Sequence, residues 1–276
     1  MSEKILICAY CGPTDRKLTR EHIIPHFIYD YYERNNYKIS GWNEFAKKTV
    51  GGQFTIKDVC ERCNHVLLGK LDSHASQFLR QHGILTDVFL QKNIELVYDY
   101  DILLRWILKL SFNAMRIDGL HSHIFSTSIN YILHSDPAGM RGFEVVVQLL
   151  SPAQHSAEEV IRLQKIGIPM SPCGKTNPLI ARVGKVHIAG SKGGFITRTV
   201  IIGALVFYLF IYDDSNQTQA FRNQVLKVFI NELKTGVILQ RDSTSMRLSA
   251  GEATWIESYG PALLRAKIYE DSKSTK

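Results

Sequence analysis

Two pairs of cysteines, each separated by two residues, constrain this chain more than any other feature. Cys8 and Cys11 form the first pair, and Cys60 and Cys63 form the second. Two intervening residues let both thiolates point to one side of a tight turn, and two such turns complete a tetrahedral four-sulfur site. One pair is enough for redox chemistry, so the presence of two favours zinc over a redox dithiol. We therefore predict one structural Zn²⁺ with no open coordination position.

The cysteine usage and the lengths of the apolar runs indicate in which cellular compartment the protein is expected. Cysteine pairs of this kind in an intracellular chain favour a metal over disulfides, and Cys173 is predicted to be a small buried hydrophobe. Met1 to Leu18 contain no apolar run of signal-peptide length. The longest apolar run, residues 200–212, is shorter than the roughly 20 residues that a membrane span needs. We expect a cytoplasmic protein without membrane contact.

Between the two cysteine pairs lies a short motif that carries reactive side chains. Glu21 and His22 stand in the run Leu-Thr-Arg-Glu-His-Ile-Ile-Pro at residues 18–25, and Asn64 directly follows the second pair. Carboxylate and amide oxygens suit a hard cation such as Mg²⁺ or Mn²⁺. An imidazole titrates near neutrality and can deprotonate a water. This combination is what hydrolysis of a phosphodiester with one metal ion requires.

The order of these pieces resembles the HNH, or ββα-metal, endonuclease family, in the branch where zinc knuckles bracket a Glu-His-Ile-Ile-Pro motif. The resemblance covers about the first 75 residues and continues into Leu-Gly-Lys-Leu-Asp at residues 68–72. It implies that Glu21 is a metal ligand on a strand, that His22 is the general base, and that Asn64 is a metal ligand on a helix. The central Asn of the family has no obvious counterpart, and Gln53 or Thr55 is the candidate to orient the base.

Each of these residues also has a simpler interpretation. Asn64 could cap the helix that follows it, as Asn often does. His65 could compete with Asn64, but adjacent helical positions are rotated by about 100°, so both rarely face one metal. Asp72 could support the metal shell or face solvent. An isolated Glu-His pair usually lies on the protein surface without a function. Only the flanking cysteines change that interpretation for Glu21 and His22.

The formal charge of +7 suits an anionic partner, and its distribution is uneven. Residues 160–200 contain seven basic residues and no acidic ones, so this stretch is the better candidate to contact a phosphate backbone. We name Lys185 and Lys192 as substrate-binding candidates. Lys192 lies in a glycine-rich turn, residues 190–194, which could cradle a phosphate but is more often a hairpin loop. The alternative for the whole stretch is a solvated strand face.

The pattern predicts an α+β fold. We expect residues 1–83 to form an HNH nuclease module with the four-cysteine zinc site, and residues 84–276 to form a larger α+β domain. Apolar spacing predicts a helix from Cys63 to a glycine stop at His82-Gly83, a buried helix at Asp99–Met115 and an amphipathic helix at Gln217–Leu233. Strands are expected at Phe143–Leu150, Leu179–Ala189 and Phe195–Tyr212. We expect residues 84–276 to serve in substrate recognition, in oligomerisation or in regulation of the nuclease, and the sequence leaves these three alternatives open.

We therefore expect a nuclease with structural Zn²⁺ and catalytic Mg²⁺ or Mn²⁺, acting on nucleic acid, with DNA favoured over RNA. An effector of a bacterial antiviral defence or toxin system, controlled by a regulatory partner protein or by homo-oligomerisation, is compatible with the family. The alternative from another class is a non-catalytic zinc module that binds nucleic acid or a partner protein. Glu21, His22 and Asn64 count against that alternative, since zinc binding does not need them.

Overall fold

The computed structural model describes residues 5–37, 40–43, 48–118, 122–136, 142–186, 194–212 and 218–257. It is a mixed α+β structure, as expected. The elements of the first part are β1 (Leu6–Cys8), β2 (Gly12–Thr14), β3 (Leu18–His22), α1 (His26–Arg34), β4 (Ser40–Asn43), β5 (Lys48–Gly51), β6 (Thr55–Cys60), the π-helical segment η1 (Arg62–Leu68) and α2 (Gly69–Gln81).

The rest of the chain adds a sheet with helices on its faces. Its first elements are β7 (Asn93–Val97), α3 (Tyr100–Asp118), the 3₁₀ segment η2 (Ser122–Ser128), α4 (Ile129–His134), β8 (Phe143–Leu149), β9 (Ala153–Gln154) and α5 (Ala157–Lys165). They are followed by β10 (Lys175–Thr176), β11 (Ala181–Val186), β12 (Phe195–Ile202), β13 (Leu205–Tyr212), α6 (Gln219–Leu233), β14 (Val237–Ile238) and β15 (Ser245–Ser249).

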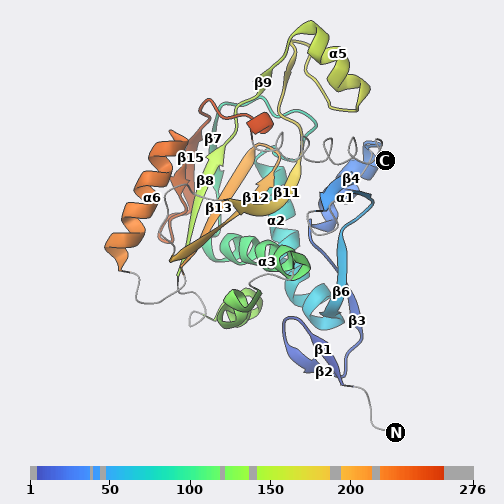
Figure 1. The fold of residues 1–276 in the computed structure, drawn as a ribbon, viewed down its shortest axis with the longest axis vertical. Helices are drawn as coiled ribbons and strands as arrows, with labels where there is room; N and C mark the ends of the chain where they lie inside the picture. Colours follow the sequence, from blue (N-terminus) through green and yellow to red (C-terminus); the bar gives the residue numbers. More distant parts are fainter. Residues whose placement is uncertain are drawn as a thin grey trace, which may run out of the picture.

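The largest sheet is antiparallel, with strand order β11-β12-β13-β8-β14. Its central strand β13 is buried along its whole length, because helices cover both faces (Figure 1). Successive side chains point to opposite faces. Phe207 and Leu209 therefore join the cluster that contains α3, whereas Tyr208 and Phe210 pack with Phe229 of α6.

At the end of the molecule opposite α5, β1 and β2 form a small hairpin next to β3 and β6 (Figure 1). β3 pairs antiparallel with β6, and its register shifts between Thr19 and Arg20. Directly after β6 the chain enters η1 and α2, so two paired strands are followed by a helix. This arrangement places Glu21 and His22 on a strand and Asn64 on the first turns of the helix.

Most of the predicted elements are present. α3, β8 and α6 lie where the sequence predicted them, and α2 ends at Gln81 with His82 as its C-cap, followed by Gly83 at a φ of +66°. The single strand predicted at 195–212 is wrong, because the chain turns between β12 and β13 at Gly203. A Cβ there would lie 3.3 Å from main-chain and side-chain atoms, and φ is +55°, so glycine suits this turn.

One buried cluster contains residues from both predicted domains. Tyr10, Ile28 and Leu71 of the first 83 residues pack in the same cluster as Trp106 and Phe207. The division at residue 83 stays a prediction, but the two parts share a continuous core. Among the described residues, no helix combines the length and the apolar character that crossing a membrane would require.

Candidate functional site: a cysteine cluster beside a Glu-His strand

The four predicted zinc ligands converge. The sulfur atoms of Cys8, Cys11, Cys60 and Cys63 all lie within 4.8 Å of one another, and the Cys11 and Cys60 sulfurs are 3.7 Å apart. A tetrahedral site with Zn–S bonds of about 2.3 Å needs sulfurs roughly 3.8 Å apart. The main-chain amides of Tyr10 and Cys60 donate to the Cys8 sulfur at 3.4 and 3.3 Å. This cluster can hold a zinc ion.

The protonation of the thiols is consistent with a site that needs a cation. Burial opposes ionisation of Cys8, but main-chain amides, that of Cys60 first, outweigh it and lower the pKa of its thiol. Burial and then the neighbouring thiols raise the pKa of Cys11 to about 11 and also raise the pKa of Cys63. A metal ion bound here would compensate the charge of the thiolates, and because its ligands must be deprotonated, acidification should release it.

His22 is partly buried and held by a chain of two side chains. The ring Nε2 lies 2.8 Å from Oε1 of Gln53, and Nε2 of Gln53 donates to Oε1 of Glu33 on α1 at 3.1 Å. A carboxylate only accepts, so it fixes the amide with its oxygen toward the imidazole. In the neutral ring Nε2 then carries the proton and Nδ1 carries the lone pair. Of the two candidates to orient His22, Gln53 is the one hydrogen-bonded to its ring, whereas Thr55 is its cross-strand partner on β6.

Glu21 is buried, with 2% of its surface exposed. Its Oε1 lies 2.9 Å from the ammonium of Lys109 and accepts from Nδ2 of Asn113, also at 2.9 Å. Lys109 in turn contacts Oδ2 of Asp72 at 2.6 Å. Burial works against the charge of Lys109, but Asp72 and Glu21 outweigh it and raise the pKa of the amine, which stays protonated. Both of these contacts of Glu21 use Oε1.

The structure keeps Glu21 and His22 on opposite sides of β3. Glu21 faces α3, whereas His22 faces Gln53 and lies beside the ring of His26, with ring centroids 4.9 Å apart. Adjacent strand residues point to opposite faces, and the bend that precedes Pro25 begins only after His22. The two side chains are therefore neighbours in the chain without sharing one face.

The helix-borne candidates differ in their surroundings. Nδ2 of Asn64 donates to Oγ1 of Thr19 and to the main-chain oxygen of Arg20, both at 2.9 Å, so Asn64 ties the helix start to β3 with its Oδ1 facing away from these bonds. His65 is exposed. Asp72 does not simply face solvent: it accepts from Nε1 of Trp106 and from Lys109, which also contacts Glu21.

Sequence reasoning missed the contribution of α3. Lys109 and Asn113 are fully buried, and Arg116 contacts Asp58 and donates to Oδ1 of Asn113 at 2.7 Å. These three polar residues recur at spacings of four and three, which puts them on one helix face. Polar side chains on one face of an otherwise apolar helix were the available signal, since buried polar groups need partners.

We expect Lys109→Met to destabilise the protein strongly. The change leaves the carboxylates of Glu21 and Asp72 without their buried counter-charge, which typically costs about 3–5 kcal/mol. Lys234→Met is the matched control, because Lys234 pairs with Glu252 on the surface, where such a pair contributes about 1 kcal/mol or less. Urea denaturation of both variants gives the comparison. Equal midpoints would show that the buried ion pairs do not stabilise the fold.

The remaining candidates lie away from this strand. Lys185 is partly buried on the edge strand β11, opposite Arg198, and Arg198 is fully buried. Lys192 and the glycine-rich turn around it, up to residue 193, lie outside the described residues. The prediction for Cys173 is wrong: its side chain is exposed, because it lies in the turn that joins Ser171 to Gly174.

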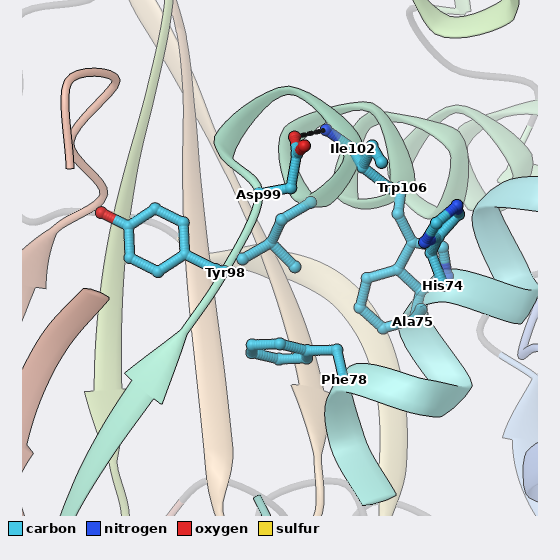
Figure 2. A pocket seen from close by; sticks show the side chains of 8 residues that line it. His74, Ala75, Phe78, Tyr98, Asp99, Ile102 and Trp106 are labelled. Carbon is cyan, nitrogen blue, oxygen red and sulfur yellow. Dashed lines mark hydrogen bonds between the residues drawn. The ribbon is translucent and has the colours of Figure 1, made fainter. Parts of the chain in front are cut away.

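A small cavity of about 50 Å³ lies between α2 and α3. Figure 2 shows its lining, mainly apolar side chains with His74 at one end. The carboxylate of Asp99 accepts from the amide of Ile102 and so caps α3. The cavity is too small for a nucleotide, and it does not contain any of the predicted site residues.

We compared the chain with family models, with curated proteins and with solved structures. No family model, no curated protein and no solved structure matches this chain.

Proposed function

We propose that the chain is a metal-dependent nuclease of the HNH type, which hydrolyses phosphodiester bonds of nucleic acid, with DNA favoured over RNA. The observation that carries this proposal is the environment of His22. Its imidazole is held at one nitrogen by the Glu33–Gln53 chain, which leaves the other nitrogen with a lone pair. A base must be fixed in orientation and tautomer, and this chain of contacts does both.

The other proposed roles follow from the same strand and helix. Glu21 and Asn64 offer hard oxygen donors, Oε2 and Oδ1, which fit Mg²⁺ or Mn²⁺. A divalent cation held by Glu21 and Asn64 would supply Lewis-acid stabilisation of the negative charge that develops on the phosphate. His22 takes the proton of the attacking water at Nδ1. A zinc ion in the cysteine cluster would join the β1–β2 hairpin to the start of η1 and so stabilise it, since so small a hairpin buries little apolar surface.

Two lysines outside this strand complete the proposed substrate contacts. Lys185 on β11 and Lys192 are the proposed contacts to the phosphate backbone, and Arg198 is excluded from that role by its burial. Control by a regulatory partner, as in a defence or toxin system, is a further proposal on the family resemblance alone.

A test of the activity uses purified protein with supercoiled plasmid and, separately, with single-stranded RNA. We expect cleavage of plasmid with Mg²⁺ or Mn²⁺, and no cleavage after a chelator removes the divalent cation. One base and one metal predict a 5′-phosphate on the product, which a ligase joins without prior kinase treatment. Cleavage that persists in excess chelator, or products that need a kinase before ligation, would contradict the proposed mechanism.

A second function is favoured by the burial of Glu21. A carboxylate already engaged by Lys109 and Asn113, on the strand face opposite His22, is what a non-catalytic module would contain. Such a module would bind nucleic acid or a partner protein through its basic surface. It predicts plasmid binding in a gel-shift assay with no cleavage under any of the metal conditions, which separates it from the nuclease.

A further inference from the structure

A chain of buried hydrogen bonds connects the cysteine cluster to the Glu-His strand. It begins at Tyr10, which stands between Cys8 and Cys11 and is 4% exposed. The hydroxyl of Tyr10 donates to Oδ1 of Asn113 on α3 at 2.6 Å. An amide oxygen only accepts, so the phenol O–H is the donor in this bond. Its ring packs edge-on against Phe112, with centroids 5.0 Å apart, and this contact fixes the direction of the O–H.

The second half of the chain starts at the amide of Asn113. Its Nδ2 donates to Oε1 of Glu21 at 2.9 Å and to the main-chain oxygen of His22 at 3.1 Å. Arg116 donates to the same Oδ1 that accepts from Tyr10. Two donors at the oxygen orient the amide, so its two N–H groups face the strand. Every polar atom of the Asn113 side chain therefore has a partner.

This arrangement exceeds what packing requires. A buried amide costs free energy unless all its groups are bonded, and an apolar residue would fill the same space. Asn113 instead joins three separate elements: the loop between β1 and β2, strand β3 and helix α3. Apart from Arg116 on the same helix, each partner of Asn113 is a residue of the proposed site or lies between Cys8 and Cys11.

We propose that Asn113 is a positioning residue, which transmits the geometry of the zinc-bound loop through Tyr10 to Glu21 and His22. Its catalytic consequence rests on the nuclease function proposed above. The zinc then does more than stabilise the module: the loop that it folds also sets where the carboxylate and the base stand. Residues that hold metal ligands and bases in this way typically change activity 10–100-fold when removed.

The test removes one hydroxyl. Tyr10→Phe keeps the ring and both cysteines but breaks the link to Asn113. Tyr208→Phe is the matched control, because its hydroxyl donates to the amide oxygen of Gln148 at 2.9 Å, also buried, but on the sheet face away from α3. For both variants we would measure zinc content, kcat and KM on plasmid, and amide hydrogen exchange of residues 18–23.

We expect Tyr10→Phe to keep one zinc per chain and a parental KM, with kcat about tenfold lower and faster exchange in residues 18–23. Tyr208→Phe should match the parent in these measurements. If Tyr10→Phe loses its zinc, Asn113→Asp replaces it, since the aspartate accepts from Tyr10 but donates nothing to Glu21.

The outcomes separate the two proposals. Parental kcat and parental exchange in Tyr10→Phe, or in Asn113→Asp where that variant is needed, would overturn the positioning role while the nuclease stands. A parent that cleaves nothing ends the nuclease proposal. The exchange rates of residues 18–23 then decide the positioning role by themselves, with equal rates in the variant and the parent counting against it.

Discussion

Replacing Cys60 with Ala should unfold the segment around the cysteine cluster and release its metal. Three thiolates hold zinc far more weakly than four, and the folding free energy of such a module is largely its metal-binding free energy, about 10–16 kcal/mol in small zinc peptides. Elemental analysis should find about one equivalent of zinc in the parent and well below one in the variant. Amide exchange in residues 5–23 should become fast, while the strands β8 and β13 stay protected, because their core lies between α3 and α6.

Cys173→Ala provides the control for this experiment. Cys173 is an exposed cysteine outside the cluster, so the variant should keep one zinc and the parental exchange pattern. A parent that is folded around Cys8 and Cys60 without any bound metal would contradict the zinc assignment. A full equivalent of zinc in the Cys60→Ala variant would show that the metal is held elsewhere.

The sequence was sufficient wherever a local rule decided the structure. The spacing of the cysteines predicted a cluster, and the four sulfurs meet as that spacing requires. The end of α2 at His82-Gly83 followed from the freedom of glycine at positive φ, and the apolar period located α3 and α6. These features depend on a few neighbouring residues, so a single sequence contains the information.

The sequence was insufficient where contacts with a distant part of the chain determine the structure. α1 was not predicted, because His26–Arg34 is rich in aromatic and polar residues, and packing of Ile28 and Tyr29 stabilises it. The turn at Gly203 divides an apolar run that the sequence alone presents as one strand. The surroundings of Glu21 depend on Lys109 and Asn113, roughly ninety residues further on, and no local pattern relates them.

In the candidate site too, the sequence predicted the residue types, whereas distant contacts determine their surroundings. The residue types at positions 21, 22 and 64 indicated what chemistry to look for, and the structure supplied their partners. Gln53 contacts His22 because β6 pairs with β3 and α1 brings Glu33 beside Gln53. Asp72 was open to two interpretations from the sequence, and the structure pairs it with an ammonium and an indole N–H of α3, which connects it through Lys109 to Glu21.

His22→Ala gives the largest effect on activity that we expect. Loss of a general base typically costs about 10²–10⁴-fold in rate. The zinc content and the fold should be retained, because the ring of His22 bonds only to the exposed side chain of Gln53 among the described residues. Steady-state cleavage of plasmid should therefore show a lower kcat at a parental KM, which is the signature of an interaction used in the transition state.

His65→Ala is the control that makes this result specific. His65 is exposed, belongs to the same part of the chain and directly follows Asn64, so it tests whether any nearby imidazole can serve as the base. We expect the parental rate from this variant, because adjacent helical positions differ by about 100° and Asn64 faces the strand. Parental cleavage by His22→Ala, in protein prepared free of contaminating nuclease, would end the assignment of His22 as the base. A large loss in His65→Ala alone would move that role to the helix.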